Sequence, residues 1–251
     1  MSELLETLRE AIAALDAADP GRRRFGAARH RYRLAPALDA AAIAEAERRL
    51  GAALPDDLRA YVAELSAGGA GPYYGLVPVD RAGAIDGPPG AGYRRGLPLA
   101  HLGCGYLAVV ACDGDARGEV WIDARALGVS APIAPSTTAF VLDWVDRVAR
   151  GRWLEPHVPP GACPLAVALS GYLAHVEAER GVAPGQLAGA DLREALGQLG
   201  PGAIEIAASS AAPWFADGEP VDPCVACLQL VENLGLLPAL VAPGALPAPL
   251  R

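Results

Sequence analysis

The segment YLAVVAC, residues 106–112, is apolar at every position, which is typical of a strand that is covered on both faces. The stretch DGDARG at 113–118 has the composition of a hairpin connection, and residues 119–123 return with alternating apolar and polar side chains. Two antiparallel strands are therefore predicted, and the first of them is central in its sheet.

Amphipathic helices are predicted before and after this hairpin. Apolar residues spaced three and four apart indicate a helix over residues 3–17, and a second helix is expected from Asp39 to Leu50. The sequence Leu54-Pro55-Asp56-Asp57 predicts the start of a third helix. Proline is tolerated in the first turn because the N–H group that it lacks would have no intrahelical partner there, and the two aspartates face the positive end of the helix dipole. Ser136 is a cap for a fourth helix. Together with the hairpin, these helices predict an α+β fold.

The stretch GGAGPYYGL, residues 68–76, places two adjacent tyrosines in a frame of glycines and one proline. Glycine permits positive φ and proline restricts φ, so the stretch predicts a shaped turn. It reads either as an ordinary connection or as a loop that presents Tyr73 and Tyr74 to a partner. A short strand is expected at 76–79, followed by a Gly/Pro-rich loop at 83–98.

Composition favours a globular cytoplasmic protein with a real core. Of the 251 residues, 52% are hydrophobic and 20% are charged, and no apolar run approaches the roughly 20 residues that cross a bilayer. The start MSELLETLRE is acidic and amphipathic, unlike a secretory signal. Five irregularly spaced cysteines do not resemble a disulfide framework, so reduced thiols are expected.

The charge balance argues against nucleic acid as the main partner, and no membrane partner is expected because no apolar run is long enough to cross a bilayer. The net charge is −8, and residues 156–251 hold 3 arginines against 9 acids, whereas phosphate backbones are bound by clustered cations. The basic run RRRFGAARHRYR at 22–33 is short and flanked by acids, which favours a solvated linker or an internal ion-pairing face over a nucleic-acid site. A basic protein partner suits this chain better.

Several short motifs follow one another in order between residues 38 and 153. They are Glu47 with Leu50-Gly51, Leu54-Pro55, Gly71 to Gly75, Gly103-Cys104-Gly105, Gly118-Glu119-Val120-Trp121 and Asp143-Trp144. In this order they resemble the SUKH superfamily, which includes a yeast cell-wall synthesis regulator and many bacterial immunity proteins that neutralise polymorphic toxins. The resemblance covers under half of the chain. It implies a mainly antiparallel sheet flanked by helices, no catalytic machinery, and binding of a cognate toxin.

The resemblance also implies which residues are scaffold, and the chemistry of other side chains suggests which are contacts. The scaffold positions are Pro55, Gly71, Gly75, Gly103, Gly105, Trp121 and Trp144. Partner contacts are expected from the two tyrosines and from an acid cluster around the hairpin. These contact residues are Tyr73, Tyr74, Asp113, Asp115, Glu119 and Asp123. The acid cluster lacks the loop spacing of a calcium site, so its expected role is to meet basic residues of the partner.

Three parts of the chain are predicted. They are an N-terminal helical extension at 1–37, a SUKH-like domain at 38–154 and a mostly helical C-terminal unit at 155–251 that follows a proline-rich boundary. Within the last part we expect a helix that begins near Leu165, a helix at 191–199, a strand at 203–208, a helix at 223–237 and an irregular tail at 240–251.

Cys224 and Cys227 are candidates for a redox-active pair or for buried apolar side chains. Cys224 and Cys227 have redox-dithiol spacing, and Asp222-Pro223 places Cys224 at a helix start, where the helix dipole lowers the pKa of a thiol. No strand precedes them as in a thioredoxin-like unit. They also share a helical face with leucines and a valine, which favours buried small hydrophobes.

Metal and catalytic sites are not expected from the sequence. His157 and Cys163 with the Cys224/Cys227 pair form a possible zinc ligand set, but only one tight pair is present. His101 and Cys104 are three residues apart and have no identifiable third orienting group. We therefore expect no catalytic residue, no metal and no cofactor.

The leading hypothesis is a cytoplasmic, non-enzymatic immunity protein that covers the active site of a cognate toxin. A second hypothesis is a scaffold or regulatory module in a larger assembly, with residues 155–251 supplying the specific contact. A third is a thiol redox enzyme that uses the Cys224/Cys227 pair.

Overall fold

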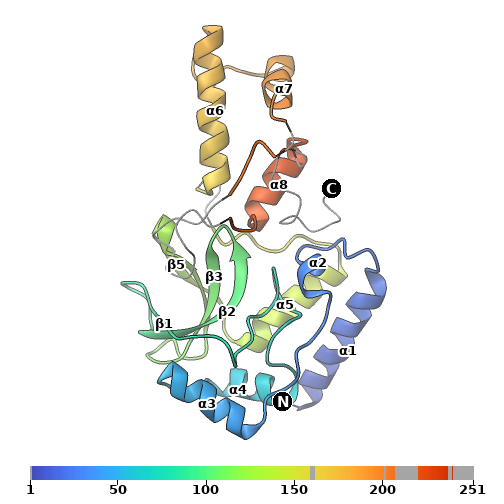
Figure 1. Ribbon diagram of the computed structural model, residues 1–251, viewed down its shortest axis with the longest axis vertical. Helices are drawn as coiled ribbons and strands as arrows, with labels where there is room; N and C mark the ends of the chain where they lie inside the picture. Colours follow the sequence, from blue (N-terminus) through green and yellow to red (C-terminus); the bar gives the residue numbers. More distant parts are fainter. Residues whose placement is uncertain (1, 159–161, 201, 207–219, 237–238, 240–251) are drawn as a thin grey trace.

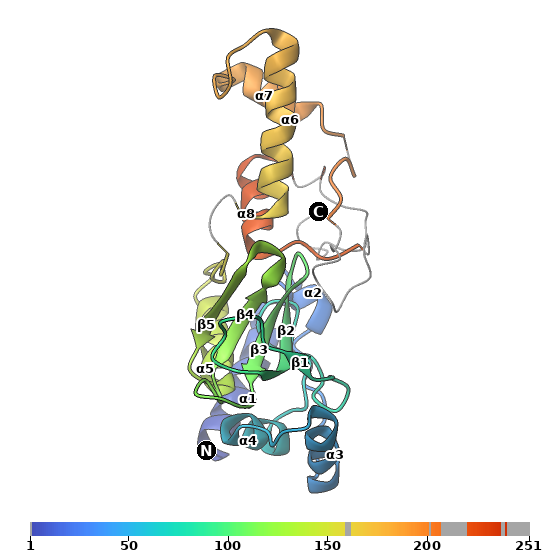
Figure 2. The same ribbon diagram turned by 90° about the vertical axis from the view of Figure 1, so that its left-hand side faces the viewer.

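A computed structural model describes residues 2–158, 162–200, 202–206, 220–236 and 239 (Figure 1). A sheet with its helices forms the body, and three C-terminal helices extend from one end of it (Figures 1 and 2). The elements are α1 (Ser2–Ala18), α2 (Ala27–His30), α3 (Ala40–Leu50), α4 (Asp56–Glu64), β1 (Ile85–Asp86), β2 (Arg95–Gly103), β3 (Tyr106–Ala111), β4 (Val120–Ala124), β5 (Val129–Ala134), α5 (Thr137–Ala149), α6 (Pro164–Arg180), α7 (Gly189–Gly197) and α8 (Val225–Asn233), with a 3₁₀ turn at Arg125–Leu127 between β4 and β5.

The five strands form one antiparallel sheet in the order β1-β2-β3-β4-β5. All six residues of β3 are buried, as its unbroken apolar sequence predicts, and β3 lies at the centre. Val109 of β3 pairs with Trp121 of β4, which confirms the predicted hairpin. The fold is α+β, with a mainly antiparallel sheet beside helices, as expected.

The two faces of the sheet are covered in different ways. Val120 and Ile122 of β4 face the main core, where they join residues of α5 such as Trp144. Val109 and Trp121 belong to the opposite face, which a smaller apolar cluster around Tyr93 covers. Figure 2 shows α5 and α1 behind the strands, so these two helices lie on one side of the sheet.

Local capping explains why the helices begin and end where the sequence predicts. The Asp39 carboxylate accepts a hydrogen bond from Ala42 N (2.8 Å) at the start of α3, and Gly51 ends this helix in the left-handed conformation. Ser136 Oγ accepts from Ala139 N (3.2 Å) at the start of α5. Pro55 occupies the N-cap of α4.

Some expected elements differ from the structure. Leu76 forms only isolated bridges, to Gly69 and to Ala100, so the strand expected at 76–79 is absent from the described residues. The expected loop at 83–98 instead contains β1 and the start of β2, and β5 was not predicted. Ile204 forms a single bridge in place of the expected strand at 203–208, of which residues 207 and 208 lie outside the described residues. Residue 237 and the tail at 240–251 also lie outside them.

The C-terminal helices continue the core of the sheet. Val158, Cys227 and Leu228 belong to the same buried cluster as the residues between the sheet and α5. Tyr172 on α6 donates its hydroxyl to Ala195 O on α7 (2.7 Å), which joins the two outer helices. The predicted boundaries after residues 37 and 154 stay predictions. Within the described residues no helix has the length and apolar character needed to cross a lipid bilayer.

Candidate functional site

The two tyrosines of the GGAGPYYGL stretch face the C-terminal part of the chain. Tyr73 is 4% exposed and donates its hydroxyl to Glu155 O (2.6 Å). Tyr74 is half-buried and donates to Pro223 O (2.6 Å). Burial raises the pKa of both phenols above the usual value, so both keep the protons that they donate.

Burial of Tyr73 contradicts its expected contact with another protein, whereas the expected contact of the half-buried Tyr74 stays a prediction. The shaped turn was predicted correctly: Tyr73 and Gly75 have positive φ, and a Cβ on Gly75 would lie 2.5 Å from Gly69 O. The turn directs the tyrosines inward because residues 155 and 223 supply backbone carbonyls there.

The expected acid cluster is divided by the structure. Asp123 is fully buried and pairs with Arg125 (2.5 Å), so its predicted partner contact is wrong. The Asp113 carboxylate accepts from the backbone N of Arg94 (2.7 Å) and of Arg95 (2.9 Å), which lowers its pKa and holds it against the strand. Asp113 thus serves the fold of the hairpin.

Two acids of that cluster remain at the surface. Asp115 is exposed in the β3–β4 hairpin, and Glu119 is half-exposed. Glu119 Oε2 accepts a hydrogen bond from the indole Nε1 of Trp121 (3.0 Å). Trp121 was expected to be scaffold, but it is half-exposed, whereas Trp144 is 1% exposed in the main core.

The remaining motif positions have clear structural roles. A Cβ on Gly71 would lie 2.5 Å from Leu76 Cγ, and a Cβ on Gly103 would lie 2.4 Å from Pro223 O. Gly103, Cys104 and Gly105 have successive φ values of 91°, 53° and 77°, which form the tight turn between β2 and β3. This turn is where the sheet meets the C-terminal unit.

The contact between that turn and the residues before α8 is polar and close. Cys104 N donates to Asp222 O (2.6 Å), and the buried Asp222 carboxylate pairs with Arg29 Nη2 (2.6 Å). Arg29 comes from the basic run at 22–33, and within the same run Arg22 pairs with Asp16. The internal ion-pairing interpretation fits these arginines.

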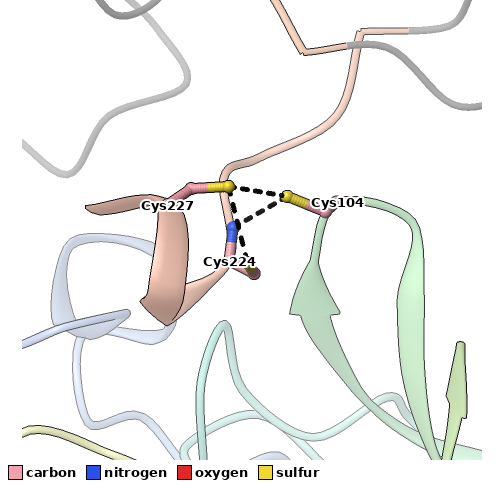
Figure 3. Close-up of side chains that lie close together, drawn as sticks. All are labelled: Cys104, Cys224 and Cys227. Atoms are coloured by element: carbon pink, nitrogen blue, oxygen red, sulfur yellow. Dashed lines mark hydrogen bonds between the residues drawn. The ribbon is translucent and has the colours of Figure 1, made fainter. Parts of the chain in front are cut away.

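Cysteine side chains gather at this contact (Figure 3). The sulfurs of Cys104, Cys224 and Cys227 all lie within 4.8 Å of one another. Cys227 Sγ is 3.4 Å from Cys104 Sγ and 3.6 Å from Cys224 Sγ. A fourth sulfur, from Cys163, lies 3.2 Å from Cys227 Sγ. We call these four residues the thiol cluster.

Three separate segments position the thiol cluster. Cys104 is the tip of the β2–β3 turn, Cys163 is the N-cap of α6, and Cys224 is the N-cap of α8 with Cys227 one turn later. All four are buried, with exposed fractions of 8%, 3%, 5% and 0%. All five cysteines of the chain are free thiols, and Cys112 lies apart with its sulfur near Val110 O.

Two backbone N–H groups point at sulfurs of the thiol cluster. Cys224 N donates to Cys104 Sγ (3.2 Å), and Ala166 N donates to Cys163 Sγ (3.4 Å). Hydrogen bonding with Cys104 lowers the pKa of Cys224, whereas bonding with Cys224 raises the pKa values of Cys104 and Cys163. Bonding with Cys104 also raises the pKa of Cys227. Four thiols are the ligand type of a metal site, and two of them could form a disulfide.

The histidines considered with these cysteines do not join the group of Cys104, Cys224 and Cys227 sulfurs that lie within 4.8 Å of one another. The ring of His101 packs on Tyr74 at 5.8 Å, and the ring of His157 packs on Tyr73 at 5.9 Å. Cys104 lies 120 residues before Cys224, and its association with the Cys224/Cys227 pair was not predicted. The available signals were a cysteine between two glycines and two cysteines at helix starts.

Comparison with protein-family models, curated proteins and solved structures finds no match in any of the three. The resemblance to the SUKH superfamily stays a prediction.

Proposed function

We propose that the chain is a non-enzymatic protein-binding domain of the SUKH type, and that it acts in the cytoplasm as an immunity protein against a protein toxin with a basic surface. The α+β architecture supports this proposal, because a five-stranded antiparallel sheet beside helices is what the resemblance implies. The net charge of −8 supports a basic partner.

The observation that carries the proposal is a half-exposed tryptophan beside acids on the sheet face opposite α5. Trp121 packs edge-on against Tyr93 with ring centroids 5.7 Å apart, and Glu119 holds its indole N–H at 3.0 Å. Asp115 is exposed in the adjoining hairpin. We call Asp115, Glu119 and Trp121 the hairpin surface.

Residues of this kind suit a protein contact. Tryptophan is enriched among the residues that dominate binding energy, and neighbouring carboxylates speed encounter with a basic partner and set its orientation. Since Tyr73 and Tyr74 are used internally, Trp121 takes the anchoring role that was expected of them. The toxin is inhibited because the bound hairpin surface covers its active site.

A second candidate function is the scaffold role. α6 extends away from the body (Figure 1), and Val167 on α6 is 61% exposed. An apolar side chain on a projecting helix favours a contact through the C-terminal unit. Burial of Cys224 and Cys227 disfavours the redox hypothesis, since an attacking thiol has to reach its substrate.

The proposal is tested by co-expressing the chain with a toxin encoded by a neighbouring gene and measuring growth rescue and the Kd of the complex. Trp121→Ala is expected to weaken binding by roughly 30-fold or more, the loss typical of a dominant contact residue. Asp115→Arg should slow association. Glu10→Arg, a reversal at an exposed position of α1, is the matched control and should change neither.

Three results would count against these assignments. Unchanged rescue and Kd for Trp121→Ala would remove the hairpin surface from the contact. Loss of complex assembly in Val167→Arg, with toxin neutralisation intact, would favour the scaffold role. Substrate turnover by the purified chain would contradict a purely binding function.

A further inference from the structure

The thiol cluster has the composition of a closed structural metal site. It contains four cysteines, two of them one helical turn apart on α8, and each is at most 8% exposed. Structural zinc sites use four ligands of this type and keep no open position for water.

The separations of the sulfurs fit a shared ion. Four thiolates at about 2.3 Å from one Zn²⁺ ion in a tetrahedron lie about 3.8 Å from one another. Cys227 Sγ lies 3.4 Å from Cys104 Sγ and 3.6 Å from Cys224 Sγ, and these three sulfurs all lie within 4.8 Å of one another. Cys163 Sγ lies 3.2 Å from Cys227 Sγ but is outside that group of three. A disulfide needs about 2.05 Å between two sulfurs and leaves the other two unexplained.

The backbone around the thiol cluster is arranged for an anionic centre. Two helices, α6 and α8, begin at the cluster, and a helix N-terminus stabilises nearby negative charge. The N–H groups of Cys224 and Ala166 point at sulfurs. Such N–H donors are the usual outer partners of thiolate ligands, because they delocalise the charge that four thiolates carry in excess of the metal.

We propose that Cys104, Cys163, Cys224 and Cys227 bind one Zn²⁺ ion, which fastens α6 and α8 to the β2–β3 turn. Figure 3 shows Cys104 reaching from the turn toward Cys227 on α8. In the zinc-bound state the Cys163 side chain rotates from its contact with Cys227 toward the other sulfurs. It then supplies the fourth ligand.

Zinc binding releases the thiol protons and involves no oxidation or reduction. Each of the four S–H bonds breaks heterolytically, the proton goes to solvent, and the sulfur electron pair forms the bond to zinc. The ion therefore links residues that lie 120 positions apart in the sequence.

The first test measures metal content in the full-length chain purified without chelator. We expect about one zinc ion per chain by elemental analysis. Replacement of zinc by Co²⁺ should give the absorption of a tetrahedral four-thiolate complex. Cys163→Ser and Cys227→Ser should reduce bound zinc to below about a tenth of the wild-type content, since each removes one of four ligands.

The matched control is Cys112→Ser, which alters a buried thiol outside the thiol cluster and should keep full zinc content. Chelation of the wild-type chain should make the described residues 155–158 and 162–164 newly sensitive to protease, because the zinc link between α6, α8 and the β2–β3 turn is lost. If a cysteine variant fails to fold, the zinc content and the Co²⁺ spectrum of the wild-type chain still decide the matter.

Several outcomes would overturn the proposal. They are a chain that stays metal-free after refolding in Zn²⁺, a disulfide between Cys104 and Cys227 in the native protein, bound iron in place of zinc, and a Co²⁺ spectrum with fewer than four thiolates. Equal zinc content in Cys112→Ser and Cys227→Ser would also do so.

Discussion

The buried imidazole of His30 makes the fold sensitive to mild acid. His30 Nδ1 accepts a hydrogen bond from Tyr32 N (3.0 Å), and its ring meets Trp144 edge-on at 5.5 Å. A proton on Nδ1 would face the Tyr32 N–H donor and break this bond. The pKa of His30 is lowered from 6.5 to about 4, mainly by burial and further by the charge of Arg22, while Asp19 partly offsets the shift.

The sign and size of the effect follow from these pKa values. Because the folded state prefers the neutral ring, the contribution of His30 is complete above the unfolded pKa of 6.5 and is lost as the pH falls toward about 4. Between pH 7.5 and pH 5, this side chain alone should lower the free energy of unfolding by about 2 kcal/mol.

Urea unfolding at both pH values tests this prediction in the wild-type chain and in His30→Asn. The asparagine Oδ1 lies near the position of Nδ1 and still accepts from Tyr32 N, but it does not titrate. The variant should therefore lose about 2 kcal/mol less than the wild type between pH 7.5 and pH 5. His175→Asn, at an exposed histidine of α6 that pairs with Glu179, is the control and should behave like the wild type. Equal pH dependence in His30→Asn and the wild type would refute the reasoning.

Two further predictions concern close contacts around the tyrosines. Tyr74→Phe leaves Pro223 O without its donor and should lower the free energy of unfolding by about 1–3 kcal/mol in chemical denaturation; an unchanged value would contradict the role of this hydroxyl. Gly26→Ala places a Cβ 1.5 Å from Tyr73 O at a φ of 77° and should abolish or severely reduce soluble folded protein. Gly128→Ala has a similar φ of 67° but open space, so thermal unfolding should show a loss of only about 1–2 kcal/mol; equal losses in the two variants would rule out the clash.

Much of the fold could be predicted from local sequence. The helices α3, α4 and α5 carry their own start signals, Asp39, Pro55 and Ser136, and β3 has an unbroken apolar run. β5 was missed because VSAPIA contains a proline and lacks alternation, both of which an edge strand tolerates. The start of β2 was missed because it follows a Gly/Pro-rich stretch.

The candidate sites were less predictable, because they depend on contacts between distant segments. The direction of Tyr73 and Tyr74 is set by carbonyls of residues 155 and 223, far along the chain. Burial of Asp123 depends on Arg125, whose guanidinium also donates to Asp86 O. The thiol cluster needs a turn in the sheet and two helix starts to meet, and no local pattern reveals such a meeting.

The separation of Cys104 from its partners has a consequence for synthesis of the protein. Successive strands pair in chain order, so the sheet can assemble as soon as its last strand has left the ribosome. Cys224 is made 120 residues after Cys104. At about 5–20 residues per second, this leaves the earlier thiol uncovered at the tip of a formed hairpin for about 6–24 seconds. During that interval the nascent chain offers its reactive sulfur to oxidants and to neighbouring chains.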